Sequence, residues 1–163
     1  MAIRMFIHGL ESSNQGTKSV FFRERYPDML IPNFSGPLEE RMDKLRGLLE
    51  GKENLLLVGS SFGGLMATLF AMEQEARVER LILLAPAVNL VTFTPSRARI
   101  LGLPVRIYHG RNDEVIPIDD VRRTAREVFS DLRFHEVEDD HSLHRTFRTM
   151  DWNALLGEAP PAA

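Results

Sequence analysis

The sequence predicts an α/β fold, a three-layer αβα sandwich on a mainly parallel sheet of about six strands. Short apolar runs alternate with longer segments of helical spacing, an order that builds parallel βαβ units. Most runs are continuously apolar, as expected of strands that helices cover on both faces. A chain of 163 residues, 44% of them hydrophobic, can bury one good core, so we expect a single domain over residues 1–157.

Apolar runs mark the expected strands, and proline or glycine residues mark the ends of most expected helices. The strands are expected within residues 3–7, 29–31, 55–58, 81–84, 105–108 and, more weakly, 132–137. The clearest helix begins at Pro37 and ends before Gly51, and others follow Gly63 and Pro117. A last helix is expected to carry Leu143, Phe147, Met150 and Leu155. Residues 158–163 offer little to bury and are expected to form a flexible tail.

Composition and charge exclude several classes of function. The net charge of -3 and the mixed distribution of charges leave no basic stripe for nucleic acid. The chain contains no cysteine, which excludes disulfides, thiolate chemistry and a Cys-type metal site. The N-terminus does not resemble a secretory signal, and no apolar run is long enough to span a bilayer. We therefore expect a cytoplasmic protein with neither nucleic acid nor membrane as a partner.

The segment Gly59-Ser60-Ser61-Phe62-Gly63 follows an expected strand and precedes an expected helix. It fits the pattern G-x-S-x-G, in which a strand turns abruptly into a helix and carries a serine at the tip. The strained backbone at the tip needs neighbours without bulk, and Gly59 and Gly63 provide that room. Ser61 is therefore the candidate nucleophile. Ser60 is the competing hydroxyl, but it stands one position early. The other interpretation is a tight loop of small residues without a chemical role.

A serine hydroxyl needs a base to take its proton and a third group to orient that base. Both kinds of residue follow downstream, after expected strands. Asp113 lies in the loop after residues 105–108, and His141 follows residues 132–137, at the start of the expected last helix. Ligands bind beyond the carboxyl ends of the strands in such sheets. The sequence therefore predicts a triad of Ser61, Asp113 and His141 at that edge.

Each member of this triad has an alternative interpretation. Asp113 can be read as an ordinary turn residue, and His141 as a solvent-exposed histidine. His144 is the main rival of His141, and His8 and His109, which stand before glycine, are expected to shape loops. The less favoured acids are Glu114, Asp119 and Asp120.

A metal site is a further alternative at the same edge. Carboxylate and imidazole groups of the kind that bind metals are clustered at Asp139, Asp140, His141 and His144. The chain has no H-E-x-x-H or comparable spacing, and acids near a helix start usually cap it, so no metal is expected. Nucleotide binding at the glycine-rich turn is excluded, since the phosphate-loop lysine and the G-x-G-x-x-G pattern are both absent.

Acyl transfer places negative charge on the former carbonyl oxygen, and two positioned N–H groups must stabilise it. One expected donor is the backbone amide of Phe62, directly after the candidate nucleophile. The second is expected in the loop after an early strand. His8-Gly9-Leu10 stands there, and the amide of Leu10 is the candidate. A simple glycine-containing turn is the alternative interpretation of this loop.

Four motifs, taken together and in this order, resemble the α/β-hydrolase family. They are His8-Gly9, Gly59-x-Ser61-x-Gly63, Gly110-x-x-Asp113-x-x-Ile116-Pro117 and His141. The order Ser, Asp, His is the one that family uses. The resemblance extends over residues 3–155 and is nearest to small, lidless, esterase-like members such as the YqiA-like proteins. Residues 86–104 leave little room for a lid, and the strands that usually precede the first motif are missing, so we expect a reduced fold without a lid domain.

The resemblance implies a serine hydrolase that cleaves small esters or thioesters through an acyl-enzyme intermediate. It implies no cofactor, and a small acyl compound as the partner. The alternative is a non-catalytic binding or regulatory protein on the same fold, for which a complete triad would be unnecessary. Arg97, Arg99 and Arg111 are considered as contacts for an acidic substrate, with a solvated surface as their other interpretation.

Overall fold

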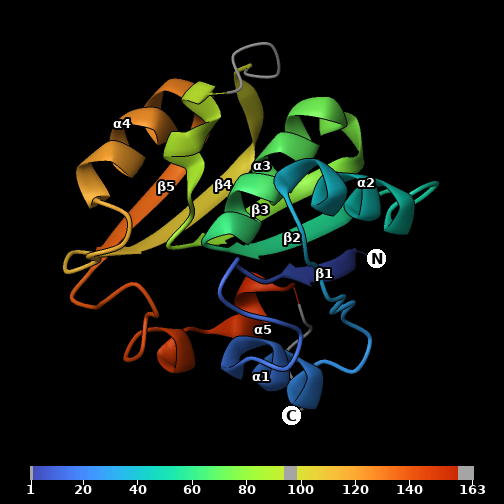
Figure 1. Ribbon diagram of the computed structural model, residues 1–163, viewed down its shortest axis with the longest axis horizontal. Coiled ribbons are helices and arrows are strands. Elements are labelled where there is room, and N and C mark those ends of the chain that lie inside the picture. The colour runs from blue at the N-terminus through green and yellow to red at the C-terminus, as the bar shows by residue number, and fades with distance from the viewer. Residues whose placement is uncertain (1, 94–98, 158–163) are drawn as a thin grey trace.

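The centre of the computed structural model, which describes residues 2–93 and 99–157, is one parallel sheet (Figure 1). Its five strands are β1 (Ile3–Ile7), β2 (Leu55–Ser60), β3 (Val78–Leu84), β4 (Leu101–Gly110) and β5 (Phe129–Val137). They lie side by side in chain order, and each neighbouring pair is parallel. Because all neighbouring strands run in the same direction, their carboxyl ends lie at one edge of the sheet.

Helices cover both faces of this sheet (Figure 1). One face carries α2 (Leu38–Leu48), α3 (Phe62–Glu73) and α4 (Ile118–Val128), and the other carries α1 (Thr17–Arg25) and α5 (Trp152–Leu155). Short 3₁₀ segments complete the order: η1 (Glu75–Arg77), η2 (Val88–Phe93) and η3 (Phe147–Thr149). Successive strand residues face opposite layers, so Ile7 packs in the core of the first face and Phe6 in that of the second. The predicted three-layer sandwich is confirmed.

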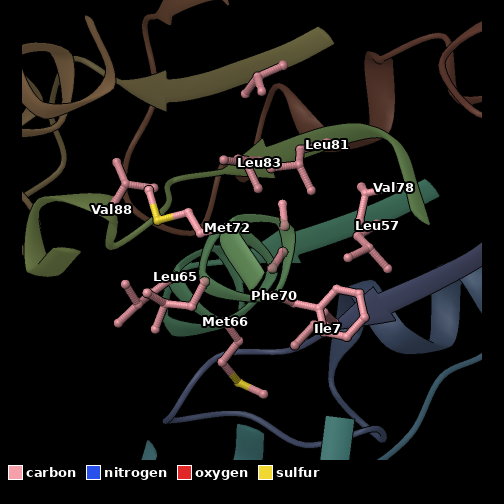
Figure 2. Packing of buried hydrophobic residues seen from close by; sticks show 14 of the residues in the cluster. Ile7, Leu57, Leu65, Met66, Phe70, Met72, Val78, Leu81, Leu83 and Val88 are labelled. Carbon is pink, nitrogen blue, oxygen red and sulfur yellow. The ribbon is translucent and has the colours of Figure 1, made fainter. Parts of the chain in front are cut away.

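The helix α3 is surrounded by packing partners. Its side chains are buried from Gly63 to Met72, as expected of a helix that is apolar all round. Leu65 and Phe70 belong to the same core as Leu57 of β2 and Leu83 of β3 (Figure 2), and α2 and η2 also contact the helix. Because α3 starts directly after Ser61, this burial fixes one arm of the turn that carries the serine.

One of the six expected strands is reduced to a single bridge beside β1. Leu30 N–H donates to Arg4 O, and Phe6 N–H donates to Leu30 O, both at 2.9 Å. The next donor toward β1 in this parallel register would be residue 32. Pro32 has no N–H, so the pairing stops there. The prediction of about six strands is therefore close, with five strands and one bridge.

The predicted continuous last helix is wrong. The chain forms η3 and the single turn α5 instead, and His141 lies in the loop before them rather than at a helix start. Leu143 has a left-handed φ of 53°, and Met150 is extended with a ψ of 143°, so neither continues a helix. The apolar side chains at these positions nevertheless reach the core between the sheet and α1. The spacing predicted the buried face but not the backbone.

The helix α1 is not among the predicted helices. Its first turn has no acidic residue, and its N-cap makes no side-chain hydrogen bond, so local signals are weak. Packing against distant parts of the chain stabilises it instead. The ring of Phe22 lies 4.8 Å from that of Trp152 and 5.5 Å from that of Phe147, measured between centroids. The spacing of apolar residues within a short segment cannot predict contacts with such distant residues.

Two expectations depend on how much of the chain is described. The predicted tail 158–163 lies outside the described residues, as do residues 94–98 within the segment considered too short for a lid. Across residues 2–93 and 99–157, no helix has the length and apolar character needed to cross a bilayer.

Leu57→Ala should lower the free energy of unfolding by about 2–5 kcal/mol, because it leaves a cavity between β2 and α3. Leu57 is fully buried, whereas Leu48 on α2 is 36% exposed. Leu48→Ala is therefore the matched control and should change the free energy by about 1 kcal/mol or less. Urea unfolding followed by circular dichroism measures both. Equal losses in the two variants would contradict this assignment of the core.

Candidate active site

Ser61 stands at the tip of a sharp turn between β2 and α3. Its φ of 54° and ψ of −116° lie outside the regions that L-residues favour, at a cost of about 1–3 kcal/mol. The surroundings hold it there. Ser61 N–H donates to Leu84 O at the end of β3, and Ser61 O accepts from Gly64 N–H and Ala87 N–H, all at 2.9 Å. The turn is thus tied to the neighbouring strand and to the loop that follows it.

The glycines on either side of Ser61 allow backbone segments to approach each other closely. A Cβ atom added at Gly59 would lie 2.5 Å from Gly63 O, and one added at Gly63 would overlap Ile7 O at the end of β1. The obstructing atoms in both cases belong to the backbone and cannot rotate away. Any side chain at either position would therefore open the turn.

Three side chains that are distant in the sequence meet at this turn. His141 Nε2 lies 3.1 Å from Ser61 Oγ, and His141 Nδ1 lies 2.7 Å from Asp113 Oδ2. A carboxylate can only accept, so Nδ1 carries the proton of the ring and Nε2 offers its lone pair to the serine hydroxyl. This tautomer is the one that a general base beside a serine needs.

Asp113 is buried, and both of its carboxylate oxygens accept hydrogen bonds. Oδ1 accepts from Val115 N–H at 2.8 Å and from Ile116 N–H at 2.7 Å. Oδ2 accepts from His141 and also lies 3.2 Å from His109 Nε2. Burial raises the pKa of this carboxyl, but hydrogen bonds from His109, His141 and Ile116 outweigh it and hold the pKa well below its usual range. The group is therefore an anion at neutral pH.

His109 is a second histidine on this carboxylate, which the sequence did not reveal. Its ring is fully buried, and Nε2 lies 2.9 Å from Ile116 O as well as close to Asp113. The prediction that His109 shapes a loop is compatible with the contact to Ile116. The contact to Asp113 depends on the fold of residues 110–116, which has no simple sequence signature.

The loop that carries His141 is held by Asp139. The Asp139 carboxylate accepts from three backbone amides, those of Asp140 at 2.8 Å, Arg145 at 3.0 Å and Thr146 at 2.7 Å. Burial raises the pKa of Asp139, but these hydrogen bonds outweigh it and the net pKa is lowered. Asp139 O also accepts from Asn112 N–H at 3.0 Å. The two loops that carry His141 and Asp113 are thereby joined.

The alternative residues make other contacts. The side chain of His144 is 77% exposed and its Nδ1 lies 3.4 Å from Asp140 Oδ2. Asp119 and Asp120 form ion pairs with arginines of their own helix α4, each at 3.0 Å. In the described parts of the chain, no group of three or more histidine and acidic side chains could hold a metal ion.

Two segments beside the serine contain the amides considered for the oxyanion. Phe62 is the first residue of α3, so its N–H has no acceptor within the helix. The backbone at Gly9 runs along the same turn, since a Cβ atom added there would lie 3.2 Å from Ser61 Cβ and 3.8 Å from Phe62 N. Leu10 follows directly. In residues 2–93 and 99–157, neither the Phe62 nor the Leu10 amide has a hydrogen-bond acceptor.

His8 holds the loop that contains Leu10. The Phe34 N–H donates to His8 Nε2, and His8 Nδ1 lies 2.8 Å from Gly9 O. An amide can only donate, so the ring is the neutral tautomer and Nδ1–H donates to Gly9 O. Burial lowers the pKa of His8, which favours this neutral form. The expected loop-shaping role of His8 matches these contacts.

A pocket of about 590 Å³ opens onto Ser61 and His141. Phe6, Leu143 and Phe147 give it apolar walls, and Leu10 also lines it. This volume suits a small organic molecule.

The chain matches a known protein family. A family model described as serine hydrolase matches residues 5–144. No curated protein matches the sequence significantly.

The fold is shared with solved structures at low sequence identity. A YdeN-like hydrolase from Pectobacterium atrosepticum is 19% identical, with a TM-score of 0.74 over 96% of this chain and 88% of that chain. Mouse alpha/beta hydrolase domain-containing protein 10 is 18% identical, with a TM-score of 0.74 over 96% of this chain and 90% of that chain. Est1E from Butyrivibrio proteoclasticus, solved with ferulic acid, is 14% identical, with a TM-score of 0.74 over 97% and 89% of the two chains. The chain has the α/β-hydrolase fold and belongs to the serine hydrolase family.

Proposed function

We propose that this protein hydrolyses small esters or thioesters through an acyl-enzyme intermediate, with Ser61 as nucleophile, His141 as base and Asp113 as the orienting acid. The observation that carries the proposal is the continuous hydrogen-bonded path from Asp113 through His141 to Ser61 Oγ. The strained backbone at Ser61 also supports it, because strain of this kind is typical of functional sites.

The proposed reaction has two steps. Ser61 Oγ attacks the acyl carbon while His141 Nε2 takes its proton, and the imidazolium then gives that proton to the departing alcohol or thiol. Water attacks the acyl-enzyme with the same histidine as base, and Ser61 is released. Asp113 remains ionised and stabilises the imidazolium in both steps. The Phe62 and Leu10 amides hold the oxyanion, a task for which loss of one donor costs about 3–4 kcal/mol.

The alternative, a non-catalytic binding protein on this fold, gives no reason for the strained serine or for the buried carboxylate behind His141. Leu10 and Val115 at the pocket mouth are 53% and 67% exposed. They leave the serine open to small acyl compounds. An open site with apolar walls favours esters and thioesters, whose activated acyl carbon needs less assistance than that of an amide.

Ser61→Ala should abolish labelling by a fluorophosphonate probe and reduce kcat for p-nitrophenyl acetate by about a million-fold. Gel fluorescence and absorbance assays measure the two effects. Ser60→Ala is the matched control, since it removes the neighbouring hydroxyl, and it should still be labelled. Undiminished labelling of Ser61→Ala would remove Ser61 from the mechanism.

Asp113→Asn should reduce kcat for p-nitrophenyl acetate by about 10⁴-fold, because an amide favours the wrong tautomer of His141. Asp120→Asn changes an acid on α4 that lies away from the serine, and it should keep wild-type activity. Steady-state kinetics with a circular dichroism check of folding separates the two variants. If a folded Asp113→Asn variant were as active as Asp120→Asn, Asp113 would have no catalytic role.

A further inference from the structure

The pocket beside Ser61 carries positive charge, although the chain as a whole has a net charge of -3. Lys18 of α1 and Arg148 of η3 line it, and Glu11 is the one acid among its described lining residues. Arg99 and Arg111, which the sequence suggested as contacts for an acidic substrate, are not among these lining residues. Arg111 is paired with Glu138 at 2.7 Å, and Arg97 lies outside the described residues.

Lys18 has hydrogen-bonding capacity that the protein leaves unused. Its ammonium donates to Ser142 O at 2.7 Å and lies 5.4 Å from the centre of the Phe147 ring. An ammonium has three donors, and in the described chain no second acceptor and no carboxylate lies within bonding distance. The side chain is half-buried. A cation in this setting gains more from an incoming anion than one in open water.

The acids near Lys18 are already engaged by other groups. Burial lowers the pKa of Lys18, and Asp140 and Asp139 act in the opposite direction. The carboxylate of Asp139 is occupied by backbone amides, and that of Asp140 faces His144 at 3.4 Å. Arg148 is exposed and has no ion pair in the described residues. Within residues 2–93 and 99–157, neither pocket cation therefore forms a direct ion pair with a carboxylate.

We infer that the substrate is an anionic ester or thioester, whose carboxylate binds the Lys18 ammonium with support from Arg148 while Ser61 attacks the acyl carbon. This inference rests on the proposed function and adds the charge of the substrate. The walls formed by Phe6 and Phe147 favour an apolar or aromatic body between the ester and the carboxylate.

Matched pairs of substrates test this charge preference. The first pair is the p-nitrophenyl monoester of terephthalic acid and its terephthalamic acid counterpart, in which the acyl part carries a carboxylate or a neutral amide. The second pair is m-acetoxybenzoate and m-acetoxybenzamide, which place the same groups on the alcohol. We expect kcat/KM of the wild type to favour the acid in at least one pair, and the preferred pair shows which side of the ester meets Lys18.

Lys18→Met should lower the acid-to-amide ratio of kcat/KM in that pair by about tenfold, through a higher KM for the acid. Arg25→Met is the matched control, because Arg25 also lies on α1 over a phenylalanine ring but outside the pocket. It should leave the ratio unchanged. Arg148→Gln should lower the ratio to a smaller extent, and rising salt should lower it in the wild type.

The outcomes separate the inference from the proposed function. The inference would be overturned if the wild type preferred the carboxylate-bearing ester in neither pair. It would also be overturned if Lys18→Met lost activity equally on the carboxylate-bearing and the amide-bearing esters. The latter result would make Lys18 only an anchor of the His141 loop through Ser142. If Lys18→Met does not fold, the Arg148→Gln ratio and the salt dependence decide. In every case the proposed function is supported if the wild type hydrolyses the ester bond of the neutral, amide-bearing substrates and Ser61→Ala does not.

Discussion

The close backbone approach at the turn between β2 and α3 is the constraint on which the site depends. Ser61 keeps an unfavourable backbone conformation because two glycines let β1, β2 and α3 touch, and because β3 supplies an acceptor for its amide. The backbone at Gly9, directly before Leu10, also lies close to the serine and to Phe62 N. Burial of α3 on all sides prevents the turn from relaxing. The geometry of the serine is thus a property of the sheet and not of a loop alone.

A second layer of hydrogen bonds sets the positions of the two loops that complete the site. Asp139 organises its own loop through backbone amides and joins it to the Asp113 loop through Asn112. The His141 loop also lies close to Gly110, since a Cβ atom added at Gly110 would lie 2.6 Å from Asp140 O. The distance between Asp113 and His141 is therefore set by backbone contacts, which are stiffer than contacts between exposed side chains.

Local patterns predicted the parts of the structure that are local in origin. The alternation of apolar runs and helical spacings predicted the layers, and the serine turn, Asp113 and His141 each follow a strand that the sequence marks. Sequence reasoning failed where distant contacts decide. The helix α1 depends on Phe22 meeting Trp152, so Lys18, which α1 delivers to the pocket, was missed. The last helix was overestimated because spacing reports which side chains are buried and not the backbone between them.

The single bridge at Leu30 also affects how the sheet meets other chains. An open edge strand exposes a row of donors and acceptors that can recruit a strand from another molecule, and proteins commonly interrupt such edges. Beside β1 the outermost segment offers one paired residue, and Pro32 then ends the ladder. Self-association by strand addition is disfavoured along this border.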